Sequence, residues 1–276
     1  MRILYSLLFT LLLPFILLRL YLRSRKSPAY RQRIPERFGF GTSISGPTIW
    51  VHAVSVGEVQ AAKPLISRLQ QQYPQHTILV TTMTPTGAER VADINGKVLH
   101  RYVPYDTPGC ISRFLSRSKS SVLIVMETEI WPNMLHYCRK QHIATILVNA
   151  RMSERSARGY ARFAGLTASA LQNFSQIAVQ NRTDEERLIQ LGANSATTHV
   201  TGSLKFDFKP PVDIQESARA LREQWGVDRK VWIAASTHKG EDEIVLEAFA
   251  QLRKRLPEAL LVLVPRHPER FNAVAA

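Results

Sequence analysis

Beyond residue 47 the sequence alternates short apolar runs with longer amphipathic stretches, and this alternation leaves few folds open. The short runs are rich in β-branched residues and are the expected strands, at residues 48–53, 76–82, 98–103, 122–126, 144–148, 176–179 and 198–201. Helical patterns lie between them, among them residues 58–72, 151–174 and 183–191. Nearly continuous apolar strands separated by helices predict a parallel sheet covered on both faces, in a doubly wound α/β domain.

A second, shorter set of elements follows the segment KFDFKPPVD at residues 205–213. A Pro-Pro pair cannot sit inside a helix or a central strand, so we expect a linker at residues 207–216. The pattern then restarts with a helix at 214–225, a strand at 231–235, a helix at 241–255 and a strand at 260–264. Two strands are too few to close a core, which predicts either an unusually small second domain or a chain that has been cut.

The N-terminus carries an almost wholly apolar run, ILYSLLFTLLLPFILL, at residues 3–18. It is slightly shorter than the roughly 20 residues that span a bilayer, but Arg2 and Arg19 can snorkel to the two interfaces. Most of the positive charge follows the run and no small-residue cleavage site is present, so we interpret residues 1–26 as an uncleaved anchor with a basic follow-on. The charge asymmetry predicts a cytoplasmic location for the globular part. A buried core helix, or a helix bent at Pro14 and lying in one leaflet, are the alternatives.

The composition is strongly basic. The chain has 36 Lys and Arg against 22 Asp and Glu, a net charge of +14, which predicts an anionic partner: nucleic acid, a phosphorylated small molecule or an acidic membrane face. Nucleic acid is the weakest of these, because the cations are dispersed or juxtamembrane and no helix-turn-helix, zinc or RNP pattern is present. Cys110 and Cys138 have no CxxC or His-rich spacing around them, so neither a disulfide framework nor a zinc site is indicated.

Glu58 follows the first expected strand, where the segment VHAVSVGEV turns from strand to helix. In open α/β sheets the ligand lies past the carboxyl ends of the strands, so this position is a candidate site. One interpretation is a carboxylate that stabilises the first turn of a helix. The other is a general base that the same helix terminus keeps ionised near neutral pH.

Other strand-to-helix loops are also rich in polar side chains. In the first domain these are Thr82, Thr84, Thr86, Glu127, Glu129, Asn149, Arg151, Ser153 and Arg155. In the second, Ser236, Thr237 and His238 precede a helix start that a nucleotide phosphate could approach, and Arg266 could form paired hydrogen bonds to phosphate. Taken singly, each is explained as a cap, a turn or a solvated cation. Together they form a more polar edge than a purely structural sheet requires.

Eight segments in order, SVGEV, TTMTPTG, YVPYD, METEIWPN, NARMSERS, GSLKFD, ASTHKGE and PRHPER, resemble the 3-deoxy-D-manno-octulosonic acid (Kdo) transferases of lipopolysaccharide synthesis. The resemblance includes the anchor and so covers essentially the whole chain. It implies a GT-B fold with two Rossmann-like domains, an acceptor domain here at residues 27–206 and a partial nucleotide-sugar domain at 217–276. It also implies location at the inner membrane.

The resemblance implies transfer of Kdo from CMP-Kdo to the tetraacyl lipid A precursor, lipid IVA, with inversion and with neither metal nor other cofactor. The glutamate of SVGEV, Glu58, is then the general base, and Glu127 and Lys205 assist the transition state. Pro265 and Arg266 of PRHPER belong to the CMP site. Arg151 and Arg155 are candidates for the acceptor phosphates, and Arg31, Arg33 and Arg37 for lipid headgroups.

One departure from the family concerns length. The family's second domain continues past PRHPER into segments that complete the CMP pocket, so we expect an incomplete donor site and little activity in this chain alone. Two other functions stay open: a membrane-anchored GT-B enzyme that uses another nucleotide sugar, and a non-catalytic module that binds anionic lipid.

Overall fold

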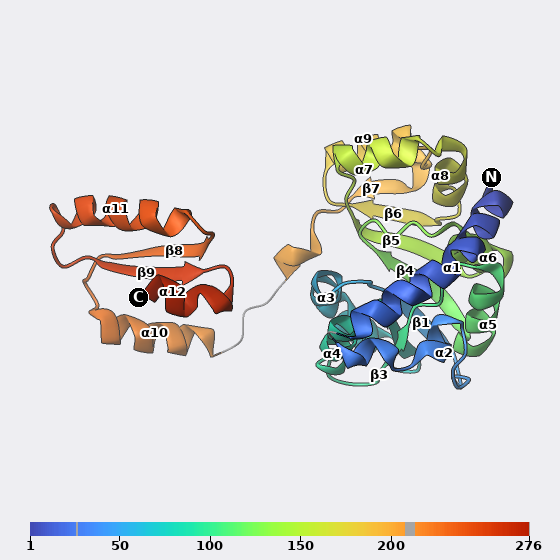
Figure 1. The fold of residues 1–276 in the computed structure, drawn as a ribbon, viewed down its shortest axis with the longest axis horizontal. Coiled ribbons are helices and arrows are strands. Elements are labelled where there is room, and N and C mark those ends of the chain that lie inside the picture. The colour runs from blue at the N-terminus through green and yellow to red at the C-terminus, as the bar shows by residue number, and fades with distance from the viewer. Residues whose placement is uncertain (26, 208–212, 276) are drawn as a thin grey trace. The chain divides into compact units, whose positions relative to one another are not determined.

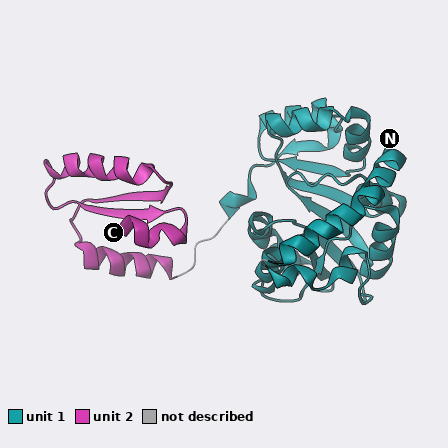
Figure 2. Ribbon diagram, viewed as in Figure 1, with its two compact units in different colours: residues 1–208 teal, residues 209–276 magenta. Residues whose placement is uncertain are grey.

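The structure is a computed structural model that describes residues 1–25, 27–207 and 213–275. The chain divides into two compact units, Met1–Phe208 and Lys209–Ala276 (Figure 2). Lys26, the last residue of the predicted anchor segment, and Pro210 and Pro211, on which the predicted linker rests, lie outside the described residues. Each unit is described separately.

Unit 1 is built on a seven-stranded sheet in which every neighbouring pair is parallel. The strand order is β3-β2-β1-β4-β5-β6-β7 (Figure 1). This confirms the α/β class and the parallel sheet predicted from the alternation. The strands are β1 Thr48–His52, β2 Thr77–Thr82, β3 Val98–Tyr102, β4 Ser120–Met126, β5 Ala144–Ala150, β6 Gln176–Val179 and β7 Thr198–Val200.

Helices follow the strands and cover the sheet. They are α3 Val56–Gln72, α4 Pro85–Ala92, α5 Pro108–Ser118, α6 Pro132–Lys140, α7 Glu154–Ala161, α8 Ala164–Leu171 and α9 Arg182–Gln190. The prediction of one helix over residues 151–174 is wrong, because the chain breaks between α7 and α8. Phe163 leaves the helical conformation at φ −121° and ψ 43°, and the hydroxyl of Thr167 donates to the Tyr160 carbonyl at 2.9 Å.

The central strand β1 shows why the sheet is buried on both faces. Ile49 and Val51 belong to one apolar cluster, together with residues of α3, and Trp50 belongs to the other, together with Phe114 of α5. All five residues of the strand are buried. A run without polar alternation is therefore what a strand between two helical layers requires.

Gly39 lies where the chain passes close to α5, and it leads to a stability prediction. Its φ is +79°, and a Cβ there would clash with the carbonyl oxygen of Cys110. Gly39→Ala is expected to destabilise unit 1 by about 2–4 kcal/mol, the sum of left-handed strain and overpacking. Gly46→Ala is the matched control, because Gly46 also has positive φ, +84°, but open space around it. Urea unfolding should show a distinctly smaller loss for Gly46→Ala, and equal losses would contradict the packing argument.

The N-terminal helix α1 (Arg2–Ser24) is long and apolar enough to cross a membrane, as judged by length and composition alone. Both of its ends lie against the rest of unit 1 (Figure 1). At the start, Arg2 donates to Asn133 at 2.9 Å and the Tyr5 hydroxyl donates to Asp106 at 3.0 Å. At the end, Ser24 is 2% exposed. The helix therefore lies along unit 1, with one face against it.

The opposite face of α1 is exposed and apolar. Its large side chains are between 49% and 79% exposed, and they are Met1, Ile3, Leu4, Leu7, Leu8, Leu11, Leu12, Phe15, Leu18, Tyr21 and Leu22. A contiguous apolar surface of this kind marks an interaction site in a folded protein, with a membrane or with another protein.

The basic residues after α1 hold the chain to unit 1. The Arg33 guanidinium donates to Glu36 at 2.7 Å and to the His100 carbonyl at 2.6 Å. Arg31 lies over the Tyr21 ring, 4.6 Å from its centroid. The expectation that Arg37 contacts lipid headgroups is wrong, because Arg37 is 2% exposed and donates to the Met83 carbonyl.

Unit 2 has two parallel strands, β8 Val231–Thr237 and β9 Leu260–Pro265. Its helices are α10 Ile214–Trp225, α11 Glu241–Arg253 and α12 Phe271–Ala275. Few of its side chains are buried, and Ile233 and Ile244 remain 56% and 67% exposed. Within the described residues, this small sheet does not build a closed core.

Candidate functional site

The strand order reverses between β1 and β4 in unit 1. From β1 the chain runs outward through β2 to β3, then returns to β4 on the other side of β1. The loops that follow β1 and β4 therefore diverge at this point, and such a divergence is where α/β proteins bind ligands. Glu58 follows β1, and Glu127 and Glu129 follow β4. The fold brings these three carboxylates, far apart in sequence, to one position on the sheet edge.

Glu58 is held at the first turn of α3. Ser55 is the N-cap, and its hydroxyl accepts from the Glu58 amide at 3.3 Å and donates to Glu58 Oε1 at 2.8 Å. Glu58 Oε2 accepts from the Val54 amide at 3.0 Å. The predicted capping role is thus present in the geometry. These bonds also fix one orientation of a carboxyl group that is 7% exposed.

The charge state of Glu58 differs from the prediction. Burial, followed by the negative charge of Glu129, raises the pKa of Glu58 to about 7, and Glu127 contributes in the same direction. The hydrogen bonds from Ser55 and Val54 act against this rise but do not cancel it. Helix-terminus stabilisation therefore does not keep Glu58 fully ionised at neutral pH. A carboxyl group that titrates near 7 can accept and release protons under physiological conditions.

Glu127 and Glu129 lie in the loop between β4 and α6. Glu127 has a left-handed backbone, with φ 53°, and its amide donates to the Val148 carbonyl at 3.0 Å. Such a conformation is uncommon for a residue other than glycine and often marks functional loops. Glu129 accepts from Trp131 Nε1 at 2.8 Å, and burial raises its pKa. The indole therefore orients the carboxylate that most strongly influences Glu58.

His52 supports this loop from the end of β1. Its ring meets Trp131 edge-on, with 5.1 Å between the centroids. Thr81 Oγ1 accepts from Trp50 Nε1, which can only donate, and bonds His52 Nδ1 at 2.9 Å. Burial lowers the pKa of His52 to about 3, so the imidazole is neutral. It is a packing element behind Trp131 and Glu129, with no proton to exchange near neutral pH.

Lys205 comes to the same edge through its backbone. It lies in a 3₁₀ turn, Leu204–Asp207, whose first residue packs against the apolar cluster that includes residues of α3. The Leu204 amide donates to Asn149 Oδ1 at 3.1 Å, and Asn149, the last residue but one of β5, has φ 53°. The Lys205 side chain is exposed, and within the described residues it forms no ion pair with the three carboxylates.

Arg151 and Arg155 lie after β5, the next strand along the sheet. The Arg151 carbonyl accepts from the Thr128 hydroxyl at 3.2 Å, which ties this loop to the loop of Glu127. Both guanidinium groups are exposed. Over the described part of the chain, neither forms an ion pair. They are therefore cations available beside the carboxylate cluster.

In unit 2, the candidate residues surround the carboxyl ends of β8 and β9. The Arg266 amide donates to the Thr237 carbonyl at 2.9 Å, so the two loops contact each other, and Pro265 is buried at the end of β9. The Thr237 hydroxyl donates to Asp242 at 2.6 Å, and Arg270 also pairs with Asp242. Thr237 is thus engaged within the unit, whereas the Arg266 side chain is exposed.

Ser236 and His238 flank Thr237 in the loop before α11. Ser236 has a left-handed backbone, with φ 63°. The His238 amide donates to Glu241 at 2.7 Å, and its ring lies 3.5 Å from the same carboxylate. The first turn of α11 carries three acidic residues, Glu241, Asp242 and Glu243. Their charge disfavours a phosphate directly at this helix terminus.

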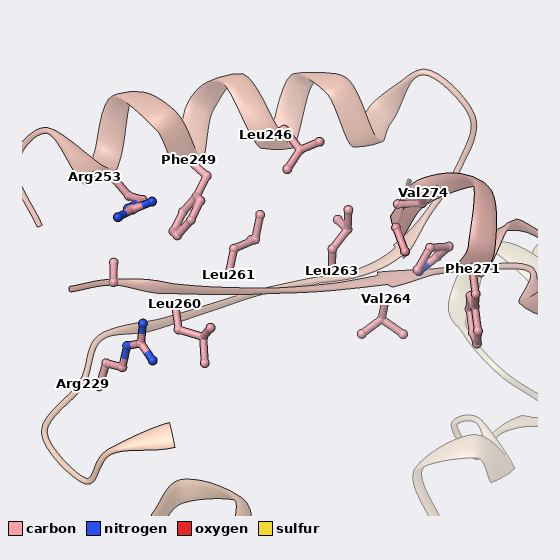
Figure 3. Close-up of a pocket in the computed structure, with 13 residues that line it drawn as sticks. Arg229, Leu246, Phe249, Arg253, Leu260, Leu261, Leu263, Val264, Phe271 and Val274 are labelled. Atoms are coloured by element: carbon pink, nitrogen blue, oxygen red, sulfur yellow. The ribbon is translucent and has the colours of Figure 1, made fainter. Parts of the chain in front are cut away.

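The cavity of about 740 Å³ in unit 2 runs along β9, and Pro265 is the one candidate among the described residues that lines it (Figure 3). Leu246 and Phe249 of α11, Leu263 of β9 and Val274 of α12 are among its lining residues, with Arg253 at the edge. Aliphatic and aromatic side chains dominate this lining. The cavity is therefore an apolar face of the small sheet and offers little to a nucleotide.

From the sequence, Glu129 and Trp131 of the METEIWPN segment were candidates without a specific role, and His52 was not a candidate. A role for Glu129 and Trp131 could have been predicted, because both lie in the same loop as Glu127. A role for His52 could not, since a histidine inside an apolar strand carries no pattern of its own. Its contact with Trp131 exists only through the pairing of β1 with β4.

A family sequence model described as 3-deoxy-D-manno-octulosonic-acid transferase (kdotransferase) matches residues 32–208. The chain is 44% identical to the 3-deoxy-D-manno-octulosonic acid transferase of Haemophilus influenzae, over 99% of this chain and 65% of that protein. It is 37% identical to the protein of the same description from Bordetella pertussis, again over 99% and 65%. The chain thus spans about two thirds of the length of these relatives.

Solved structures with low sequence identity share the fold. A UDP-GlcNAc 2-epimerase from Neisseria meningitidis matches with a TM-score of 0.55 at 14% identity, over 83% of this chain and 68% of that one. A glycosyltransferase from Rickettsia africae matches with a TM-score of 0.53 at 11% identity, over 85% and 64%. These likenesses agree with the predicted fold class, the α/β Rossmann-like fold of GT-B glycosyltransferases. Because the family sequence model covers most of unit 1, the chain belongs to the 3-deoxy-D-manno-octulosonic acid (Kdo) transferase family.

Proposed function

We propose that the protein containing this chain transfers Kdo from CMP-Kdo to lipid IVA at the cytoplasmic face of the inner membrane. The transfer inverts the anomeric carbon and needs no metal. Unit 1 binds the acceptor, and unit 2 contributes to the donor site. The observation that carries the proposal is Glu58, a buried and oriented carboxyl group with a pKa of about 7, at the switch point of a Kdo-transferase-family sheet.

In the proposed reaction Glu58 accepts the proton of an acceptor hydroxyl as the oxygen attacks the anomeric carbon of Kdo. The bond from that carbon to the CMP phosphate oxygen breaks, and CMP leaves with the electron pair. General-base assistance of this kind is worth about 10²–10⁴ in rate. Its efficiency is highest when the pKa of the base is near the working pH, which fits a carboxyl group raised to about 7 by burial and Glu129.

The other carboxylates and cations take complementary roles. Glu127 stabilises the positive charge that develops on the sugar. Lys205 or Arg266 stabilises the negative charge that develops on the departing phosphate. Arg151 and Arg155 bind acceptor phosphates, which their exposure beside the carboxylate cluster allows. Pro265 shapes the CMP site. The loop next to the CMP site contains Ser236, Thr237 and His238. The hydrogen bond from Thr237 to Asp242 holds this loop in place.

The test is Kdo transfer from CMP-Kdo to lipid IVA by this chain joined to the part of the Haemophilus influenzae relative that it does not match. We expect kcat/KM to rise with pH and level off above about 7, because Glu58 must be ionised to act as a base. Glu129→Gln removes the negative charge that adds to the effect of burial on this pKa, so the rise in kcat/KM should move to lower pH. Asp93→Asn, at an exposed residue of a remote ion pair with Arg90, should leave the profile unchanged.

Two other outcomes identify the alternatives. Transfer from a UDP-sugar but not from CMP-Kdo would establish a GT-B enzyme with another donor. Lipid binding without transfer from either donor would favour a non-catalytic module for anionic lipid. If Glu129→Gln leaves the pH profile of kcat/KM unchanged, Glu58 is not the general base.

A further inference from the structure

An apolar groove of about 570 Å³ lies in unit 1 between α1 and the pair α7 and α8. Leu4, Leu8 and Leu12 of α1 form one side, and Tyr160 and Phe163 form the other. The volume is within the range of about 300–1,000 Å³ that is usual for ligand sites. None of the residues that line the groove is charged apart from the N-terminal amino group of Met1.

The groove begins beside the candidate active site. Ile130 lines it in the same loop as Glu129, and Pro132, the first residue of α6, lines it as well. The Tyr160 hydroxyl donates to the Thr128 carbonyl at 3.0 Å, which joins the groove wall to that loop. A molecule whose polar part lies at the carboxylates can therefore extend an apolar part directly into the groove.

A basic pocket of about 530 Å³ adjoins the groove and shares Pro132, Leu166 and Ala170 with it. Its cations are Arg2, Arg139 and Lys140, and none of its lining residues is Asp or Glu. The pair of cavities thus offers an apolar surface next to positive charge. Their chemistry complements an anionic amphiphile, with an acyl chain in one cavity and a phosphate at the other.

The exposed face of α1 connects the groove to a membrane. Leu4, Leu8 and Leu12 line the groove and are each more than half exposed, on the face that carries the other apolar side chains of the helix. If that face rests in the bilayer interface, an acyl chain can enter the groove without crossing water.

We propose that this groove binds an acyl chain of the glycolipid acceptor, with a phosphate of the same molecule at the basic pocket. The proposal rests on the proposed function for the identity of the acceptor. It assigns α1 a part in substrate binding in addition to membrane attachment. The groove would then select acylated acceptors over the same sugar without its chains.

Gly159 offers a way to close the groove without disturbing the fold. It lines the groove in α7, its φ is not positive, and a Cβ there would meet nothing within 4 Å. Gly159→Leu places a side chain into the groove and replaces a poor helix former with a good one. Ala161→Leu is the matched control, because Ala161 is exposed on the same helix and does not line the groove.

The experiment uses the chain of 276 residues in detergent micelles and a lipid IVA analogue with a photoreactive acyl chain. We expect labelling of the groove at Tyr160, Phe163 or Leu8, mapped by mass spectrometry and suppressed by unlabelled lipid IVA. Gly159→Leu should reduce labelling about tenfold, the effect of excluding roughly two methylene groups from apolar burial. Ala161→Leu should label like the wild type.

A second probe, photoreactive phosphatidylglycerol, distinguishes the source of the chain. If it labels the groove as strongly, and excess phosphatidylglycerol displaces the glycolipid, the groove is a general lipid contact and the proposal is wrong. Labelling only outside the groove, or unchanged labelling of Gly159→Leu, also overturns it. Labelling is read without catalysis, so a groove that binds the glycolipid in a protein that transfers no Kdo would refute the proposed function alone.

Discussion

Glu58→Gln is expected to reduce Kdo transfer by about 10²–10⁴ in kcat, the usual contribution of a general base. Glutamine keeps the shape of the side chain, and its oxygen can still accept from the Val54 amide. The amide cannot take a proton from the acceptor. The measurement is kcat at saturating CMP-Kdo and lipid IVA, and KM should change little because substrate contacts are preserved.

Stability provides the control for Glu58→Gln. Burial and Glu129 raise the folded-state pKa of Glu58 to about 7, from 4.5 for the unperturbed group. The folded state thus binds the proton more tightly, and its stability falls as pH rises from about 4.5 to 7. At pH 8 the glutamine variant avoids this cost, on the order of 2–3 kcal/mol. An inactive variant that is also less stable at pH 8 would contradict this account, and an active one would leave Glu58 with a capping role only.

Asp106→Ala is expected to destabilise unit 1 by about 3–5 kcal/mol, because three donors lose their acceptor at about 1–3 kcal/mol each. Asp106 is 1% exposed. Its carboxylate accepts from the amides of Asn133 and Met134 at 3.0 and 2.7 Å, and from the Tyr5 hydroxyl at 3.0 Å. Alanine leaves the two amides at the start of α6 and the Tyr5 hydroxyl without their acceptor.

Two comparisons make the Asp106 prediction specific. Tyr5→Phe removes only the hydrogen bond from α1 to the Asp106 carboxylate and should cost about 1 kcal/mol. Asp93→Ala removes an exposed carboxylate and should cost less than about 0.5 kcal/mol. Urea unfolding in detergent measures all three, and hydrogen exchange should show faster exchange in α1 for Asp106→Ala. Unchanged exchange there would mean that other contacts hold α1 against unit 1.

Several elements could be predicted closely from the sequence. The strand β6 and the helix α10 occupy the expected residues, Gln176–Val179 and Ile214–Trp225. Local pattern and turn residues suffice for such elements. The break between α7 and α8 could not be predicted, because residues 151–174 contain no proline. Packing decides it, through the Tyr160 hydroxyl on the Thr128 carbonyl and the Thr167 hydroxyl on the Tyr160 carbonyl.

The position of α1 also required the tertiary structure. Length and hydropathy identify an apolar helix, but they are the same for a helix that spans a bilayer and for one that lies along its own protein. Arg2 and Tyr5 meet Asn133 and Asp106, more than a hundred residues away in the chain. Polar side chains in the first turn of an apolar helix therefore had partners that no local pattern could indicate.

The sequence by itself determined the parallel α/β sheet and the placement of Glu58 and Glu127 at its carboxyl edge, because strands of parallel sheets all end at one edge. Only the tertiary structure decided that the loops after β1 and β4 are neighbours, and that Glu129 approaches Glu58. Desolvation and charge repulsion depend on distance through space rather than on separation along the chain. For that reason the sequence located the proposed base, while the fold sets its pKa near neutrality.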